Sequence, residues 1–308
     1  MGLNGVIRPG LIQLRVMDLD ATLTHYKDYL GLDEVCRTDD GRVCLKCYDE
    51  FEHHSVVLKL DDKAGYDFSA FKVESEVFLD QLEKKIRAFG YETYHIPANS
   101  DQPGFGRRVG CKLCTGHKIE FYAEVESAKE RPEITNPDIW VTPPRGMRCQ
   151  RFDHMLLFGP GIEEAERFCV EVLGLFVPEV CNTPDGKRLA SWITGSNKPH
   201  DLAFVEYDVP NTLHHVGFLL EDWNDIGNAA DWMARYQIKH DVGPTRHAIT
   251  RGQTIYMWDP SGIRNEVYAG GYTAYPDHPQ RVWDQGMLGK GLFYYEGELV
   301  PSFLTVVT

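Results

Sequence analysis

Alternation of apolar and polar residues predicts short strands along the chain, and apolar residues spaced three and four apart predict amphipathic helices between them. Strands at 12–16 and 153–157 each begin a similar series of elements. Asp40-Gly41 and Asp185-Gly186 predict tight turns between the strands that follow. Helices are expected at 21–29, 76–89, 163–172 and 222–236. The pattern indicates an α+β protein.

The second series repeats the first. Residues 116–122 read Gly-His-Lys-Ile-Glu-Phe-Tyr, and residues 262–268 read Gly-Ile-Arg-Asn-Glu-Val-Tyr. The chain is therefore predicted to be a tandem duplication built of βαβββ modules in two domains. A proline-rich polar stretch predicts the linker between them. The expected divisions are 1–130, a linker at 131–148, 149–271, and a non-repeated tail at 272–308 that covers the active site.

The duplication provides an internal control on candidate functional residues, because positions that serve only the fold should match between the copies. The predicted alignment pairs His154 with Gln13, His215 with Phe68, and Glu266 with Glu120. Only the second copy carries two histidines and a glutamate. The module therefore does not need those histidines in order to fold, which favours a chemical role for them.

Length and charge narrow the possible functions. A chain of 308 residues suffices for about two domains. A formal net charge of −14 repels nucleic-acid phosphates and anionic lipid, which argues against both as partners. No apolar run approaches the ~18 residues of a membrane span, and the first residues do not form a signal peptide. We expect a cytoplasmic protein.

Two Cys-x-x-Cys pairs could each form half of a zinc site. Cys44 and Cys47 form one pair, and Cys111 and Cys114 form the other. Both lie on predicted strands, where residues three apart face opposite sides of a sheet and cannot meet one ion without a turn. Buried free thiols are the better interpretation.

His154, His215 and Glu266 are the candidate metal ligands. Period-two alternation allows their side chains to face one concave surface of the second domain. Two imidazoles and one carboxylate hold non-heme Fe(II) on one face and leave the other face open, and the same set accepts Mn(II). An aromatic diol and O2 could then bind side by side, which predicts an oxygenase. The alternative for His214-His215 is one ring in the core and one on the surface.

A diol that binds a metal must lose a proton, and the reduced oxygen must later gain one, so an acid/base group near neutral pKa is required. His200 is the candidate, although its repeat partner His54 leaves a structural role open. His247 and Tyr256 can donate hydrogen bonds to bound oxygens. A turn at 259–262 folds the strand of Tyr256 back beside the candidate carboxylate.

The segment from Thr245 to Glu266 resembles the signature of the type I extradiol ring-cleaving dioxygenases, which are two-module members of the vicinal oxygen chelate superfamily. It fits their pattern at each fixed position, including Asp259-Pro260 and Gly262. The layout is similar over residues 8–308. The resemblance implies the vicinal oxygen chelate fold, with Fe(II) held by the three candidate ligands.

The resemblance also implies a reaction. Members of this family cleave catechol and substituted catechols with O2, next to the two hydroxyls, to 2-hydroxymuconic semialdehyde in bacterial degradation of aromatic compounds, and they generally form homotetramers. By this carry-over His200 is the acid/base, and His247 and Tyr256 contact substrate. The positions expected at the pocket wall are Ile249, Leu292 and Phe303. The sequence does not decide the preferred ring substituent.

Two other functions fit the same superfamily. A glyoxalase-type metal isomerase draws ligands from both modules, and here only Gln13 and Glu120 of the first copy could serve. An aromatic-drug-sequestering binding protein uses the paired modules as a groove and needs no metal. Oxygen consumption distinguishes the dioxygenase from the isomerase, and metal analysis of protein purified without air distinguishes it from the binding protein.

Overall fold

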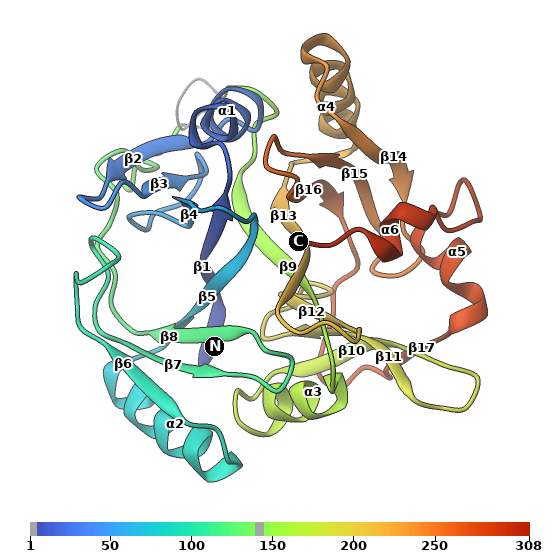
Figure 1. The fold of residues 1–308 in the computed structure, drawn as a ribbon, viewed down its shortest axis with the longest axis horizontal. Coiled ribbons are helices and arrows are strands. Elements are labelled where there is room, and N and C mark those ends of the chain that lie inside the picture. The colour runs from blue at the N-terminus through green and yellow to red at the C-terminus, as the bar shows by residue number, and fades with distance from the viewer. Residues whose placement is uncertain (1–4, 139–144) are drawn as a thin grey trace.

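The computed structural model describes residues 5–138 and 145–308. Two curved mixed sheets lie side by side, with the helices at 76–89, 162–171 and 223–236 at the periphery (Figure 1). The first half of the chain forms the sheet β2-β3-β4-β1-β5-β8-β7-β6. Its elements are β1 Val6–Val16, α1 Leu19–Thr24, η1 His25–Tyr29, β2 Asp33–Arg37, β3 Val43–Lys46, β4 Val56–Leu60, β5 Gly65–Val73, α2 Glu76–Phe89, β6 Thr93–Ile96, β7 Arg108–Lys112 and β8 Lys118–Tyr122.

The second half forms the sheet β14-β15-β16-β13-β9-β12-β11-β10-β17, in the same order with one strand added. Its repeated elements are β9 Arg151–Gly159, α3 Ile162–Glu171, β10 Phe176–Asn182, β11 Arg188–Thr194, β12 Leu202–Glu206, β13 Thr212–Leu219, α4 Trp223–Tyr236, β14 His240–Arg246, β15 Gly252–Trp258 and β16 Arg264–Gly270. The tail adds β17 Arg281–Asp284, η2 Gln285–Met287, α5 Leu288–Leu292 and α6 Pro301–Thr305.

Each sheet consists of two βαβββ modules that meet through their first strands. In the first half, β1 and β5 pair antiparallel, and in the second half β9 and β13 do the same. Each first strand also pairs in parallel with the last strand of its own module, as β1 does with β4 and β13 does with β16. The predicted α+β fold of tandem βαβββ modules is confirmed.

The helices agree with the apolar spacing. The prediction for 76–89 coincides with α2, whereas α3 begins and ends one residue before its predicted bounds and α4 begins one residue after its predicted start. Ser75 and Asp222 accept hydrogen bonds from backbone N–H groups in the first turns of α2 and α4, which explains where these helices begin. The first predicted helix is instead split into α1 and the wider turn η1.

The turn η1 carries a contact between the two halves. The buried His25 ring lies 2.8 Å from Asn265 Oδ1, and Asn265 Nδ2 donates to Tyr26 Oη at 3.0 Å. Ser261, at the turn before β16, bonds the Thr22 hydroxyl at 2.9 Å. The first half therefore packs directly against the strand that carries Glu266.

The strand register corrects one part of the predicted repeat alignment. Ala70 and Gly217 are equivalent, because each lies beside the repeated glutamate of its own half. Ala70 pairs with Leu11, and Gly217 pairs with His154. The counterpart of His154 is therefore Leu11, and the alignment with Gln13 was wrong. Register shifts in β1 and β9 make such an offset hard to see in sequence.

The first half neutralises its repeated carboxylate with an arginine. Glu120 accepts a hydrogen bond of 2.7 Å from Arg108 Nε, and Arg108 also pairs with Asp101. Arg108 is fully buried, and its guanidinium lies 5.8 Å from the centre of the Phe68 ring. Phe68 is the residue equivalent to His215. A cationic side chain thus occupies the space where the second half gathers its histidines. Gln13 and Glu120 are therefore not available as a second ligand set.

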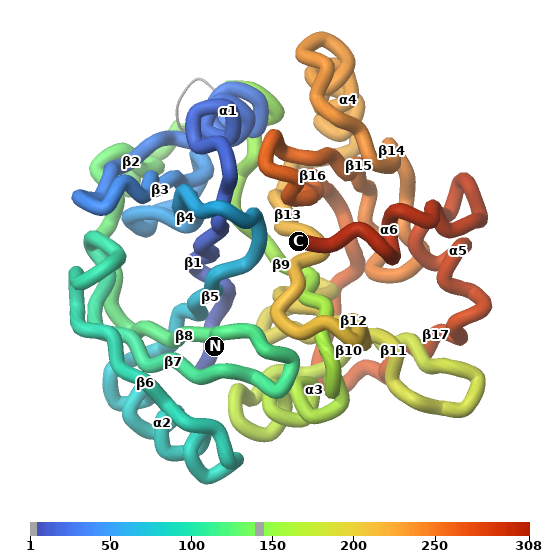
Figure 2. The backbone as a smooth tube through the Cα atoms, viewed as in Figure 1, coloured from blue at the N-terminus to red at the C-terminus, as the bar shows by residue number. Residues whose placement is uncertain are grey.

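The tail returns to the middle of the molecule. Its strand β17 pairs in parallel with β10, and the backbones of Thr308 and Leu213 exchange hydrogen bonds of 2.6 and 3.0 Å (Figure 2). The predicted linker at 131–148 lies partly outside the described residues, because 139–144 are not described. Its described parts form no helix or strand. No helix in the described ranges is long and apolar enough to cross a membrane.

The cysteines agree with the prediction of free thiols. All eight are free, and Cys44, Cys47 and Cys111 are buried, whereas Cys114 is partly exposed. Within residues 5–138 and 145–308, neither Cys-x-x-Cys pair belongs to a cluster that could hold a metal. The zinc interpretation is thereby removed for these pairs.

Arg108→Met should lower the free energy of unfolding by about 3–5 kcal/mol, because it leaves the buried Glu120 carboxylate without its cation. Urea unfolding of parent and variant measures this loss. The double variant Arg108→Met/Glu120→Met removes both charges and should regain most of the stability. A single variant as stable as the parent would contradict the pairing.

Candidate metal centre

Three neighbouring strands bring the predicted ligands together. His154 lies in β9, His215 in β13 and Glu266 in β16, and β13 is the middle strand of the three. Gly217 in β13 pairs with both His154 and Glu266. A Cβ atom at Gly217 would lie 2.3 Å from the His154 ring, so only glycine leaves room for this imidazole over the middle strand.

The donor atoms of the three residues converge. His154 Nε2 and His215 Nε2 lie 2.9 and 3.1 Å from Glu266 Oε2, and 3.3 Å from each other. All three side chains are buried. Three ligand bonds of about 2.1 Å that meet at right angles place neighbouring donors about 3.0 Å apart. The observed spacing therefore fits one ion bound on a single face.

Electrostatics keep the carboxylate ionised. Burial alone would raise the pKa of Glu266, but the close contacts with the imidazoles of His154, His215 and His247 outweigh it and hold the pKa well below its ordinary value. Thr254 Oγ1 also donates to Glu266 Oε1 at 2.6 Å. Burial lowers the pKa of His215 to about 4, so its imidazole is neutral, as a metal ligand must be.

A buried carboxylate orients His154. His154 Nδ1 donates to Asp153 Oδ2 at 3.1 Å, which leaves Nε2 with its lone pair toward the other ligands. Tyr268 Oη donates to the same oxygen at 2.7 Å, and Lys198 Nζ lies 3.0 Å from it. Burial by itself raises the pKa of Asp153, but the Lys198 ammonium and the bond from His154 hold it well below its usual range.

The three predicted catalytic residues surround the same point. His247 Nε2 lies 2.9 Å from Tyr256 Oη and 3.6 Å from Glu266 Oε1. Tyr256 pairs with Glu266 across the β15–β16 ladder, as the predicted turn requires. The His200 ring lies 4.3 Å from that of His154, just before β12. Its buried Nδ1 has no hydrogen-bond partner among residues 5–138 and 145–308, and burial lowers its pKa well below the ordinary value.

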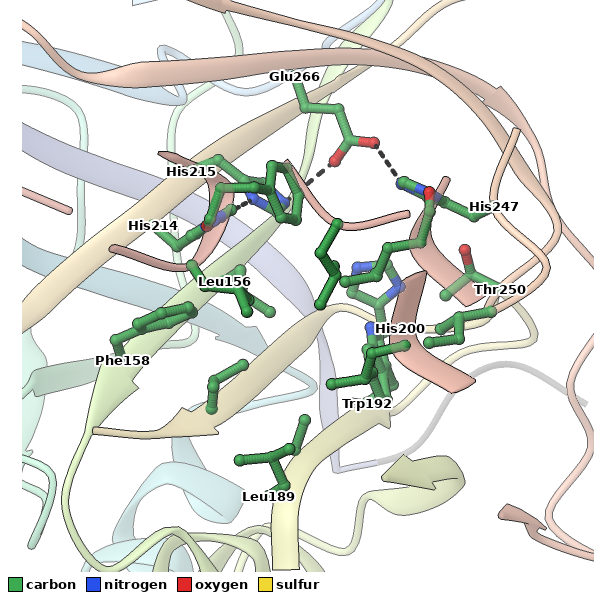
Figure 3. A pocket seen from close by; sticks show the side chains of 18 of the residues that line it. Leu156, Phe158, Leu189, Trp192, His200, His214, His215, His247, Thr250 and Glu266 are labelled. Carbon is green, nitrogen blue, oxygen red and sulfur yellow. Dashed lines mark hydrogen bonds and ion pairs between the residues drawn. The ribbon is translucent and has the colours of Figure 1, made fainter. Parts of the chain in front are cut away.

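These groups open into one cavity of about 330 Å³ (Figure 3). In the view shown, Glu266 lies between His215 and His247, with lines to both. The polar end of the cavity is formed by the three candidate ligands with His200, His247 and Tyr256. Its apolar wall includes Leu156, Phe158, Trp192, Ile249, Leu292 and Phe303. The structure thus places all three predicted wall residues around this space.

Four residues that orient the site were not predicted. Asp153, Lys198 and Tyr268 form the network behind His154, and His214 contacts His215. Of these contacts, only those between Asp153 and His154 and between His214 and His215 could have been suspected from the sequence, because the two residues of each pair are adjacent in the chain. Lys198 and Tyr268 reach Asp153 from distant segments, and nothing in sequence spacing indicates this contact.

Family models match both halves of the chain. One, described as the catechol 2,3-dioxygenase-like N-terminal domain, matches residues 66–126. Another, described as the glyoxalase/bleomycin resistance protein/dioxygenase superfamily, matches residues 151–267. The second match covers all three candidate ligands.

Full-length relatives are similar in sequence and structure. A metapyrocatechase of Pseudomonas sp. (strain CF600) is 43% identical over 99% of both chains. A manganese-dependent 2,3-dihydroxybiphenyl 1,2-dioxygenase of Geobacillus genomosp. 3 is 27% identical over 95% of both chains. The crystal structure of the 2,3-dioxygenase LapB from Pseudomonas sp. KL28 superposes with a TM-score of 0.89, at 41% identity, over 92% of this chain and 99% of that one.

Asp153→Asn should weaken binding of a divalent metal by about ten- to a hundredfold, because an amide orients and polarises the His154 ring less than a carboxylate does. Equilibrium competition with a chelator under anaerobic conditions measures the affinity. Asp185→Asn, in an exposed turn, is the matched control and should bind as the parent does. Unchanged affinity in Asp153→Asn would remove this carboxylate from its assigned role.

Proposed function

Because this chain belongs to the extradiol ring-cleaving dioxygenases, with metapyrocatechase (catechol 2,3-dioxygenase) as a full-length relative, we propose that His154, His215 and Glu266 bind the Fe(II) that this chemistry uses. The enzyme cleaves catechol beside its two hydroxyls with O2, to 2-hydroxymuconic semialdehyde. The convergence of the three donor atoms is the observation that carries the ligand assignment.

The residues present fit this metal. Two neutral imidazoles and one carboxylate leave an Fe(II) site with a net charge of about +1 and three free positions, which a catecholate and O2 can fill together. When bound, the metal supplies the electron relay that lets a singlet diol react with triplet oxygen. Mn(II) fits the same donors, and a manganese-dependent enzyme is among the relatives.

We assign the proton transfers to His200. Its Nδ1 is buried without a partner in the described part of the chain, and the ring faces the cavity beside His154. A neutral imidazole there can take a proton from the diol and later return one to oxygen. His247 Nε2 and Tyr256 Oη lie 2.9 Å apart at the edge of the cavity, and either group can exchange this bond for one to a substrate oxygen.

The shape of the cavity supports a small aromatic substrate. About 330 Å³ is at the lower end of ligand sites, and the polar groups gather at one end of an otherwise apolar space. We propose that Ile249, Leu292 and Phe303 hold the ring by apolar contact. Substituents on the ring would then point at α5 and α6, so the tail sets their permitted size.

We also propose the wider organisation that the family resemblance implies. Residues 1–130 form a domain without a complete metal site, 131–148 a linker, 149–271 the catalytic domain, and 272–308 a cover over the cavity. The enzyme acts in the cytoplasm as a homotetramer, with no nucleic acid or membrane partner. Light scattering on the purified protein tests the tetramer.

His215→Ala should abolish ring cleavage and metal retention together, because two remaining donors cannot hold the ion on one face. Anaerobic reconstitution with Fe(II) or Mn(II), followed by catechol and air, tests this through the yellow product and oxygen uptake. His278→Ala, at an exposed histidine, is the control and should remain active. An isomerase or a binding protein would consume no oxygen.

His200→Ala should keep the metal but slow turnover by about 10²–10⁴-fold, the usual contribution of a positioned acid/base group. Steady-state rates at matched metal content measure the effect. Turnover equal to the parent's would show that the proton transfers do not need His200.

A further inference from the structure

His214 lies in the cavity wall together with the ligand next to it. Neighbouring residues of a regular strand face opposite sides, but the register of β13 shifts between Leu213 and His215. Both imidazoles consequently line the same cavity, with Nδ1 of His214 only 2.7 Å from Nδ1 of His215. One hydrogen must lie between these two nitrogens.

A carbonyl of the tail decides which nitrogen carries that hydrogen. His214 Nε2 lies 2.5 Å from the backbone oxygen of Phe303, which can only accept, so Nε2 is protonated. A neutral His214 then has its lone pair at Nδ1, and His215 Nδ1 must donate to it. The second nitrogen of His215, Nε2, is thereby left with its lone pair, 3.1 Å from Glu266. That is the form a metal ligand needs.

The position of this carbonyl depends on how α6 docks. Arg264 donates to the backbone oxygens of Ser302 and Val306 at 3.1 and 2.9 Å, and to that of His214 at 3.2 Å. The Phe303 ring packs edge-on against the His214 ring with 4.5 Å between centres. If residues 301–308 move away, His214 loses the acceptor that selects its tautomer.

His154 offers a contrast inside the same site. Its Nδ1 is held by Asp153, the adjacent residue of the same strand, and by no group of the tail. The two histidine ligands are therefore oriented by different parts of the molecule. Undocking of α6 changes the orienting contacts of His215 and leaves those of His154 in place.

We propose that His214 is a positioning residue that couples docking of the C-terminal segment 301–308 to metal binding. The docked segment selects the tautomer of His215 that can bind the ion, and the bound ion in turn stabilises the docked segment. Such coupling is reciprocal, because each event changes the free energy of the other by the same amount. The proposal rests on the assignment of His215 as a ligand.

Three variants separate the effect of the His214 hydrogen bonds from the effect of simple packing. His214→Phe keeps a planar ring between Phe158 and Phe303 but removes both nitrogens. His214→Gln supplies an amide that can accept from His215 and donate to the Phe303 carbonyl. Asp153→Asn weakens the other histidine ligand without touching the tail, and is the matched control.

The measurements are Mn(II) affinity, by anaerobic chelator competition, and amide hydrogen exchange in residues 301–308 with and without saturating Mn(II). In the parent, Mn(II) should slow exchange in this segment. His214→Phe should lose about ten- to a hundredfold in affinity, and the metal should no longer slow exchange there. His214→Gln should recover part of both effects. Asp153→Asn should bind weakly yet keep the metal-dependent slowing.

A variant at Phe303 tests the coupling without changing His214, and the double variant tests whether both act through the same contact. Phe303→Ala loosens the segment from the other side and should lower Mn(II) affinity in the parent, but add little to His214→Phe. The proposed coupling is wrong if His214→Phe binds Mn(II) as tightly as the parent does. It is also wrong if the parent binds Mn(II) and cleaves catechol but Mn(II) does not change amide hydrogen exchange in residues 301–308. A parent that binds no metal would instead overturn the proposed function.

Discussion

Two imidazoles and a carboxylate are held within hydrogen-bonding distance of one another in a buried place, and the surrounding structure follows from this requirement. An isolated carboxylate would be costly there, so Glu266 is surrounded by imidazole rings and by the Thr254 hydroxyl, which donates to it. The three adjacent strands β9, β13 and β16 set the spacing, and the missing side chain of Gly217 lets the His154 ring lie across the middle strand. A twisted sheet supplies the rigidity that three converging donors need.

The duplicated halves meet the same electrostatic problem in two ways. Both bury a glutamate at the same point of the sheet. In the first half Arg108 provides a permanent counter-charge, which closes the space and makes the domain a support. In the second half no arginine approaches Glu266 in the described residues; His154 and His215 lie against it instead, and the space is an open cavity. The first half still contributes, because His25 and Tyr26 hold Asn265, next to Glu266.

The cavity is formed partly by the sheet and partly by the tail. The ligands, His200 and Tyr256 belong to the sheet or its edge, whereas Leu292 and Phe303 belong to short helices of the tail. His247 connects the two, since its Nδ1 bonds the Leu292 carbonyl and its Nε2 bonds Tyr256. A rigid polar end with a peripheral apolar cover suits an enzyme that admits an organic ring and oxygen but must exclude bulk water during the reaction.

The sequence alone determined the tandem βαβββ fold, the helix at 76–89, and the two histidines and glutamate that converge, because period and residue type are local properties of the chain. The predicted counterpart of His154 was Gln13, two residues away from the true counterpart, Leu11. The error arose because strand bulges shift the pairing register without leaving a pattern in the sequence. Only the tertiary structure decided which groups orient the ligands. Lys198 and Tyr268 reach Asp153, and the Phe303 carbonyl reaches His214, across long sequence separations, and such contacts arise from packing.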